Sequence, residues 1–533
     1  MRFCKSALVT ALVWGISQSL GGAPLLPLAA AAPEPRPIPA AVGVSGSLPV
    51  ARRNASLLAS VPGRRTPAAV AEAAAARGRE PDALLSRPVD GLPAGRVGGR
   101  APAGVLGAQQ EELFWAYDFH LATYYPTRAA LAVRSDVARV YVEHGLELPA
   151  GAAEALHATF VNMVAPAVRD AYGPEPLPGM DGDPAITVLL LDIRDALYHR
   201  HDAPTYFSGY FDPVNQRRQV DLDRAGSAAR SNEREMLYVD VAPPSDPLGR
   251  VVRQTLAHEM AHLVQWAHGE RDADWLVEGL SELAVHLSGL GHPREHVLAF
   301  LDAPAASLIT WDGHPRDYGK VYLFLLYLYE QVGEGNRHWL RRLVQNQDGG
   351  IGALAAELPL DRPLPHALRD FAFALHLDLE REGDGRYGFR SLDLASGPTA
   401  PDTFPMPRLN RRTLRDADRG SAEHGPWSFR SEGLDVLSRG FELEMDGFTN
   451  VCLGATLVPR ARGAPIHVGC TAPGTPIAWR FERPAAGAAS TLILLTVTNG
   501  SDLPTESTWS VVPDVGIQSA GGRLHVPLAL APR

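Results

Sequence analysis

The most informative part of this 533-residue chain is Leu256–Glu282, which reads LAHEMAHLVQWAHGERDADWLVEGLSE. It contains the motif H-E-x-x-H at His258–His262, within a helical pattern of apolar residues. An α-helix turns about 100° per residue, so the two histidines are about 40° apart around the axis and about 6 Å apart along it. Both imidazoles are therefore predicted to lie on one helix face, with Glu259 at its flank.

Two imidazoles arranged in this way can bind one metal ion, and the motif is typical of the zinc site of peptidases. We expect His258 and His262 to be zinc ligands and Zn²⁺ to be the cofactor. We expect Glu259 to act as the general base, which accepts a proton from the attacking water and delivers it to the leaving amine. The alternative is a surface helix with two ordinary histidines. The acid-rich helix that follows at a suitable distance favours the zinc site.

The composition is that of a globular protein, with 45% apolar and 21% charged residues. A chain of this length predicts two or three domains. The net charge of −10 comes without a basic cluster, so no nucleic-acid partner is expected. The expected partners are protein or peptide substrates, and we expect a monomer.

The N-terminus has the layout of an export signal. Arg2 and Lys5 accompany a short apolar run, and small residues follow at Ala29–Ala32. We therefore expect a signal peptide at 1–31 and a secreted protein, extracellular or periplasmic. The run is too short to span a bilayer, and no later stretch predicts a membrane helix. A retained amphipathic anchor is the alternative. Residues 32–105, rich in Pro, Ala, Gly and Arg, are predicted to be a linker or pro-segment.

After the expected signal peptide, the remaining cysteines are Cys452 and Cys470. Two cysteines in an exported chain predict one disulfide, which would close a loop of about 18 residues. Two buried free thiols are the alternative.

The order of patterns predicts an α+β unit over 106–390. Strand patterns and one amphipathic helix at 151–172 precede the motif, and helices at 275–290 and 318–332 follow it. The strand-then-helix order gives this unit its α+β class. Residues 391–425 are predicted to be a linker. Short strand-like runs over 426–533, separated by Gly and Pro turns, predict a C-terminal all-β, sandwich-like domain.

Five motifs follow one another at characteristic spacings over roughly residues 110–390. They are G-Y-F-D at Gly209–Asp212, S-N-E-R-E-M-L-Y-V-D at Ser231–Asp240, H-E-M-A-H at His258–His262, W-L-V-E-G-L-S-E-L-A at Trp275–Ala284 and Y-L-F-L-L-Y-L at Tyr322–Leu328. This set resembles the gluzincins, and more narrowly the hyicolysin family of secreted metallopeptidases. The resemblance implies a zinc-dependent endopeptidase with a thermolysin-like core, which consists of a mixed-sheet subdomain plus a helical subdomain.

The third zinc ligand has two candidates. His268 stands ten residues after His258, at metzincin spacing, but the chain has Gln265 where metzincins have a glycine that ends the helix. In a continuing helix His268 would lie about 280° round from His258 and face away from the metal. Glu278 is the favoured ligand, because Trp275–Gly279 resembles the setting of the gluzincin glutamate. Fifteen residues separate it from His262, fewer than is common among those relatives.

Two further residues are predicted to assist the zinc site. Glu282 lies one turn after Glu278, where it could accept the spare ring N–H of a ligating histidine; a solvated charge is the alternative. Tyr318 follows the loop WDGHPRDYG and is the candidate phenol that helps zinc to stabilise the oxyanion, a role that Tyr or His has in related gluzincins. Packing in the helical subdomain is the alternative for Tyr318.

Other functions stay open at this point. A secreted binding protein or adhesin would have a vestigial or structural zinc site, but the intact Glu259 favours an active one. An aminopeptidase would need an acidic anchor for the substrate amine, which we do not identify. Asp181-Gly182-Asp183 allows a Ca²⁺ site, although an Asp-Gly turn before a strand explains these residues more simply.

Overall fold

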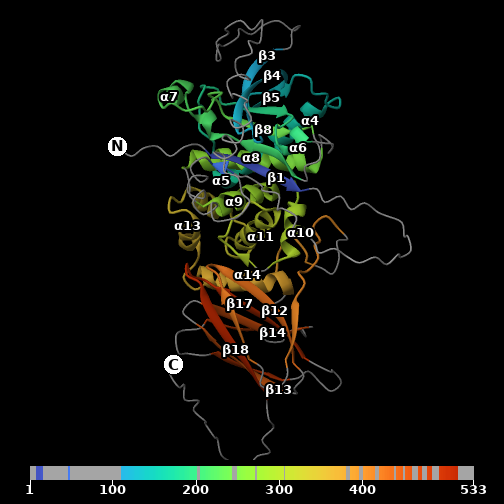
Figure 1. Cartoon of the computed structure of the whole chain (residues 1–533), viewed down its shortest axis with the longest axis vertical. Coiled ribbons are helices and arrows are strands. Elements are labelled where there is room, and N and C mark those ends of the chain that lie inside the picture. The colour runs from blue at the N-terminus through green and yellow to red at the C-terminus, as the bar shows by residue number, and fades with distance from the viewer. Residues whose placement is uncertain are drawn as a thin grey trace, which may run out of the picture.

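The structure is a computed structural model of the whole chain (Figure 1). It describes residues 8–15, 46–47, 110–200, 205–242, 249–269, 273–304, 306–379, 384–394, 400–414, 419–436, 440–447, 451–458, 466–470, 477–482 and 491–513. Along the long axis of the molecule, the described part forms a large sheet, a group of helices and a second region of strands.

The large sheet has eight strands in the order β2-β1-β7-β8-β6-β5-β4-β3. Their bounds are Leu8–Gly15 (β1), Gly46–Ser47 (β2), Glu111–Asp118 (β3), Thr123–Arg134 (β4), Ala138–Glu143 (β5), Ile186–Leu191 (β6), Thr205–Phe211 (β7) and Met236–Asp240 (β8). The central strands β5, β6 and β8 are parallel, and the other pairs are antiparallel. Every residue of β6 and β8 is buried, as expected for central strands with both faces covered.

Helical segments alternate with these strands along the chain. They are α4 (Ala152–Thr159), π-helix η1 (Phe160–Val164), α5 (Ala165–Tyr172), α6 (Ala196–Arg200), 3₁₀-helix η2 (Pro213–Gln216), α7 (Gln219–Arg224) and α8 (Arg250–Ala267). Of these, α4 and α8 pack on the sheet. The helix predicted over 151–172 is therefore present, with a π turn in its middle. Helix α8 carries the H-E-x-x-H motif and packs against β7 and β8.

The helical region consists of α9 (Asp274–Leu287), α10 (Arg294–Leu301), α11 (Pro315–Gln331), α12 (Arg337–Gln345), α13 (Gly350–Glu357) and α14 (Leu364–Leu377). Pro315 opens α11 after a capping box formed by His314 and Asp317. Helices α9 and α11 approach closely at Gly279, where a Cβ atom would lie 2.8 Å from Leu325. The glycine of the W-L-V-E-G motif is thus required for this contact.

The C-terminal region contains two sheets, in agreement with the predicted all-β domain. Their strands are β10 (Asn410–Leu414), β11 (Arg419–His424), β12 (Ser428–Val436), β13 (Gly440–Gly447), β14 (Val451–Val458), β15 (His467–Cys470), β16 (Ile477–Glu482), β17 (Thr491–Asn499) and β18 (Thr505–Pro513). One sheet has the order β10-β12-β17-β14-β15, and the other has the order β11-β18-β13-β16. Apolar residues from both sheets, including Leu434, Leu443 and Phe481, form their shared core.

Two predictions made from the sequence can be compared with the structure of this region. The predicted disulfide is present: Cys452 and Cys470 face each other on β14 and β15 and are bonded. The linker predicted over 391–425 instead contains β10 and β11, each of which is the outer strand of its sheet. Polar and charged residues such as Arg411, Arg412 and Glu423 outnumber apolar ones in these two strands, as is usual at sheet edges, so the strands lack the apolar alternation that marks inner strands.

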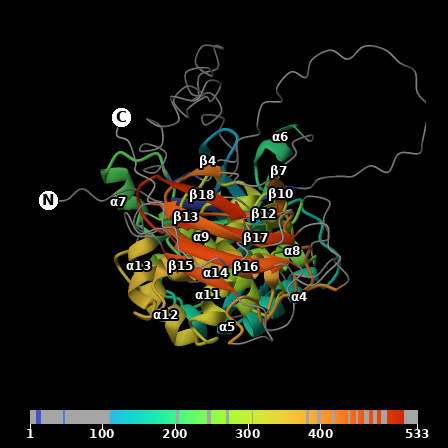
Figure 2. The ribbon, with the colours of Figure 1, turned by 90° about the horizontal axis from the view of Figure 1, so that it is seen from below.

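The C-terminal region, which we call the β module (410–513), docks against the helices. The short strand β9 (Ala306–Ser307) pairs with β12, and Phe373 of α14 lies against Gly454 so closely that a Cβ atom there would overlap its ring. Figure 2 views the molecule from this end, with the strands of the module over α14. The chain thus has a mixed α and β architecture with several sheets. Among the described residues, no helix is both long and apolar enough to cross a membrane.

Candidate metal centre

Three side chains from two helices meet in the interior beside the large sheet. His258 and His262 come from α8, and Glu278 comes from α9. Their potential ligand atoms all lie within 4.8 Å of one another. The Nε2 atoms of the two histidines are 3.0 Å apart, and Glu278 Oε2 lies 3.2 Å from His258 Nε2 and 3.5 Å from His262 Nε2. Each of the three side chains is at most 4% exposed.

These separations fit a zinc ion. Ligand atoms about 2.0–2.1 Å from one zinc ion at tetrahedral angles lie about 3.3 Å from one another. The three observed separations fall on both sides of that value. Two imidazoles and one carboxylate are also a ligand set found in catalytic zinc sites. The residues present therefore fit zinc, and the predicted set of His258, His262 and Glu278 is brought together.

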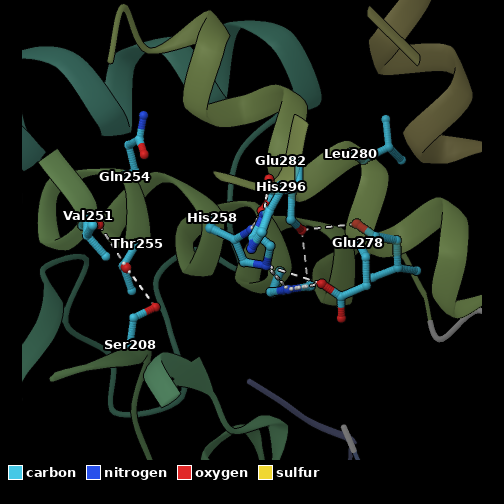
Figure 3. Close-up of polar contacts among 12 residues, drawn as sticks. Ser208, Val251, Gln254, Thr255, His258, Glu278, Leu280, Glu282 and His296 are labelled. Carbon is cyan, nitrogen blue, oxygen red and sulfur yellow. Dashed lines mark hydrogen bonds and ion pairs between the residues drawn. The ribbon is translucent and has the colours of Figure 1, made fainter. Parts of the chain in front are cut away.

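The second ring nitrogen of each histidine also has a defined neighbour. Ser281 Oγ donates to the Val277 carbonyl and lies 3.2 Å from His262 Nδ1, so it accepts the proton of that nitrogen. Glu282 Oε1 lies 3.0 Å from His258 Nδ1 and forms an ion pair with it, outside the angles of a regular hydrogen bond; this is the position predicted for a carboxylate that supports a ligand (Figure 3). Both contacts leave Nε2 of each ring available to a cation.

Charge in this buried group is shared among its members. Burial lowers the pKa of His258, but Glu278 and Glu282 outweigh this effect and raise it to about 10. Burial raises the pKa of Glu282, but His296 and His258 outweigh this and hold it at about 2. The pKa of Glu278 is likewise held below its usual range, against burial, mainly by His262 and His258. Ionised carboxylates around imidazole nitrogens are a suitable setting for a divalent cation, which would displace the ring proton.

Glu259 is the residue of the motif that does not join the ligand atoms. Its side chain is fully buried, and no side chain hydrogen-bonds to either carboxylate oxygen among the described residues; the Phe211 amide lowers its pKa but does not meet the geometry of a regular hydrogen bond. Burial raises its pKa to about 8, with His258 acting in the opposite direction and Glu278 in the same one. A buried carboxylate with so few hydrogen bonds is costly, and its raised pKa beside the candidate cation site makes Glu259 a candidate functional residue.

A glycine explains how strand β7 reaches this carboxylate. Gly209 lies against Thr255, one turn before Glu259 on α8, so closely that a Cβ atom there would overlap the threonine methyl group. The same Cβ atom would lie 3.4 Å from Cγ of Glu259. The glycine of the G-Y-F-D motif therefore has a physical reason: it lets the strand run close to α8 and to the stem of the Glu259 side chain.

Tyr318 lies near the centre but is enclosed. Its ring centroid is 6.3 Å from that of His258, and it packs between His296 at 4.9 Å and Trp311 at 4.8 Å. The side chain is fully buried, and burial together with the nearby Glu278 raises its pKa. Tyr318 thus lies beside the two histidines, with the contacts of a packed core residue.

His268 lies elsewhere. It caps the C-terminus of α8, and a Cβ atom on Gly173 would be 2.8 Å from its Nε2. Gln347 donates to its carbonyl oxygen at 2.8 Å. His268 therefore faces α5 and the 345–347 segment, as predicted for a helix that continues past Gln265.

The predicted Asp-Gly turn is formed before β6. Asp181 accepts from the Asp183 amide, Asp183 accepts from the Ala185 amide, and Gly182 has a φ of 76°. The Asp183 carboxylate also pairs with Arg139. These contacts are sufficient to explain the conformation of the turn.

Sequence reasoning missed three residues of this centre. Ser281 follows Glu278 by three positions, and Gln265 follows His262 by three, so helical periodicity could have indicated both. Gln265 Nε2 donates to Ser281 Oγ at 3.0 Å and to the Val277 carbonyl at 3.1 Å. His296 comes from α10, and no local pattern links it to the motif.

Comparisons with known proteins give little guidance. No protein-family model matches the chain, and no curated protein matches it. Five chains of solved structures match. The pre-peptidase C-terminal domain of collagenase from Bacillus anthracis is 17% identical, over 20% of this chain and 94% of that chain, with a TM-score of 0.16. Tripeptidyl peptidase 2 (TPP II) is 9% identical, over 20% of this chain and 10% of that chain, with a TM-score of 0.15. Likenesses this weak support no conclusion about fold or activity.

Proposed function

We propose that the protein is a secreted zinc metalloendopeptidase of the gluzincin type, with a thermolysin-like core. The observation that carries the proposal is the convergence of His258, His262 and Glu278 beside the buried carboxylate of Glu259, to which no side chain in the described part of the chain hydrogen-bonds. A structural zinc site would need only the three ligands and would not explain a buried carboxylate next to them that lacks a side-chain hydrogen bond.

Each residue has a definite task in this proposal. His258, His262 and Glu278 bind the cation, while Glu282 and Ser281 orient the two imidazoles. Zinc in this site would lower the pKa of a bound water to about 7 and polarise the scissile carbonyl. Glu259 takes the proton of the attacking water on a carboxylate oxygen and transfers it to the nitrogen of the leaving amine.

The edge of β7 supports a peptide as the substrate. In the structure an extended segment of this chain, β1, pairs antiparallel with β7 from Thr205 to Phe211, beside the helix that carries Glu259. Addition of a strand to a sheet edge is a common mode of peptide recognition. Because residues 1–31 are the expected signal peptide, its removal would open this edge to an extended substrate. We propose that substrates pair with β7 in this way.

Tyr318 is the proposed stabiliser of the oxyanion. Its position beside His258 supports the role, and its enclosed packing supports a structural one. Tyr318→Phe keeps the ring and removes the hydroxyl, so a lower kcat with unchanged zinc content would support the catalytic role. Unchanged kcat would leave Tyr318 as a packing residue.

Glu259→Gln tests the function as a whole. The variant should bind zinc as the wild type does and should lose activity on casein by more than the lower limit of general-base effects, which is about a hundredfold. Glu154→Gln on the exposed face of α4 is the matched control and should be fully active. A wild type that binds zinc but cleaves no protein, or a Glu259→Gln variant within about tenfold of wild type, would favour a binding protein or another mechanism.

A further inference from the structure

The carboxylate of Glu282 connects two histidines. Its Oε1 atom lies 3.0 Å from His258 Nδ1, and its Oε2 atom lies 2.9 Å from His296 Nδ1. All three side chains are at most 1% exposed. Figure 3 shows Glu282 together with these two histidines and with Glu278. The candidate metal centre therefore includes a further side chain, His296 of α10, which contacts Glu282 and not the ligand atoms.

We propose that His296 is a positioning residue of the metal centre, which holds Glu282 in the orientation that presents Oε1 to His258. The inference rests on the proposed function, because it assumes that His258 binds zinc through Nε2. It adds a residue that has no contact with the ligand atoms themselves and acts only through Glu282.

The need for such a partner follows from burial. A buried carboxylate oxygen that loses its hydrogen bond costs about 1–3 kcal/mol, and more when the group is charged. Without the donor on His296, Glu282 would rotate towards another donor or take up a proton. Either change would weaken its contact with His258 Nδ1, which selects the ring tautomer that offers Nε2 to a cation.

Helix packing fixes His296 in turn. Its ring stacks on Tyr318 with the ring planes 26° apart. Its backbone carbonyl lies against Gly319 of α11, where a Cβ atom would overlap it. Helices α10 and α11 thus meet at a glycine, and this contact sets the position from which Nδ1 reaches Glu282.

The competing explanation is that His296 only fills space beside Tyr318. Two substitutions separate the explanations, because each keeps one property of the ring. His296→Phe keeps a stacked aromatic ring but has no N–H donor. His296→Asn loses the ring but has an amide N–H close to the place of Nδ1.

The measurement is the zinc dissociation constant, obtained by competition with a chromophoric chelator, together with the thermal unfolding of the zinc-free protein. We expect His296→Phe to weaken zinc binding about ten- to a hundredfold, the usual range for residues that support metal ligands. We expect His296→Asn to bind zinc within about threefold of wild type, even if the loss of packing lowers its unfolding temperature. His286→Asn is the control, since His286 lies one turn after Glu282 and stacks instead on His292.

The opposite ranking, with zinc binding kept by phenylalanine and weakened by asparagine, would overturn the proposal in favour of packing. Equal affinity of all variants would also overturn it. If His296→Phe does not fold, His296→Asn decides alone: wild-type affinity supports positioning, and a tenfold loss contradicts it. Failure of the proposed function is distinguishable, because the wild type itself would then bind no zinc or would cleave no protein.

Discussion

Ser281 Oγ lies 3.2 Å from Nδ1 of His262 and donates its own proton to the Val277 carbonyl. This geometry makes the serine an acceptor for the imidazole and fixes the tautomer of His262. We predict that Ser281→Ala weakens zinc binding about tenfold or more, as expected for loss of a residue that supports a ligand. The zinc dissociation constant measures the effect.

Ser288→Ala is a suitable control for that substitution. Ser288 is the buried C-cap residue of the same helix, and its hydroxyl has no hydrogen-bond partner among the described residues. Removal of this hydroxyl should leave zinc affinity unchanged. Equal zinc affinities of the Ser281→Ala variant and the wild type would show that His262 does not depend on the serine.

The third ligand gives a second prediction. Glu278 Oε2 approaches both histidine Nε2 atoms, whereas His268 lies beside Gly173. Glu278→Ala should therefore strip zinc and abolish activity, while His268→Ala should retain both. Zinc content by mass spectrometry after dialysis decides between them. Zinc retained in Glu278→Ala and lost from His268→Ala would instead point to a metzincin.

The cluster of candidate ligands could be predicted from the sequence to the extent that helix geometry is local. His258, Glu259 and His262 share one helix, so their arrangement follows from 3.6 residues per turn. Glu278 was identified only through the resemblance. Its position depends on packing between helices, including the close approach of α9 to α11 at Gly279, and no local sequence pattern shows such packing. His296 could not be predicted, since it reaches Glu282 only through the packing of a third helix.

The fold was predictable where apolar periodicity is strong. Strand β6 and helix α11 have long apolar patterns, and both were expected. Strands β10 and β11 were not, because the sequences NRRTL and RGSAEH carry the charges of edge strands and resemble a linker. Their strand character comes from pairing with β12 and β18 and is absent from the local pattern.

Acid should destabilise the β module through His424. This side chain is 3% exposed and contacts Ser507 Oγ at 2.8 Å. Burial, assisted by Arg430, lowers its pKa from 6.5 to about 4. The unfolded chain therefore binds a proton more readily, so the stabilisation is complete above pH 6.5 and is lost as the pH falls towards 4.

The shift corresponds to at most about 3 kcal/mol of unfolding free energy. His424→Gln keeps a donor near Ser507 and cannot titrate in this range. Denaturant unfolding at pH 7 and pH 4 should therefore show a smaller loss of stability for the variant than for the wild type. An identical pH dependence of the two proteins would exclude His424 as a source of acid sensitivity.

Lys320 gives the last prediction, because it links the metal-site helices to the β module. Its buried ammonium group donates to the carbonyl oxygens of Ser307 and Thr310, at 2.9 and 2.7 Å. Ser307 belongs to β9, which pairs with β12, and the next amide, that of Leu308, donates to the Trp427 carbonyl at 2.7 Å. Lys320→Met would leave two carbonyl oxygens without their donor and should cost about 2–4 kcal/mol of stability.

The loss should concentrate in the segment that Lys320 holds. In the wild type, local opening of 306–310 must break the two lysine hydrogen bonds. Lys320→Met lacks these bonds, so the free energy of local opening is lower, and we expect hydrogen exchange at the Leu308 amide to become faster. Arg316→Met, which removes an exposed charge from the same helix, should leave this exchange unchanged. Zinc affinity should also be unchanged in Lys320→Met, since no ligand is touched. Equal Leu308 protection in the wild type and Lys320→Met would show that β9 is held to β12 without the lysine.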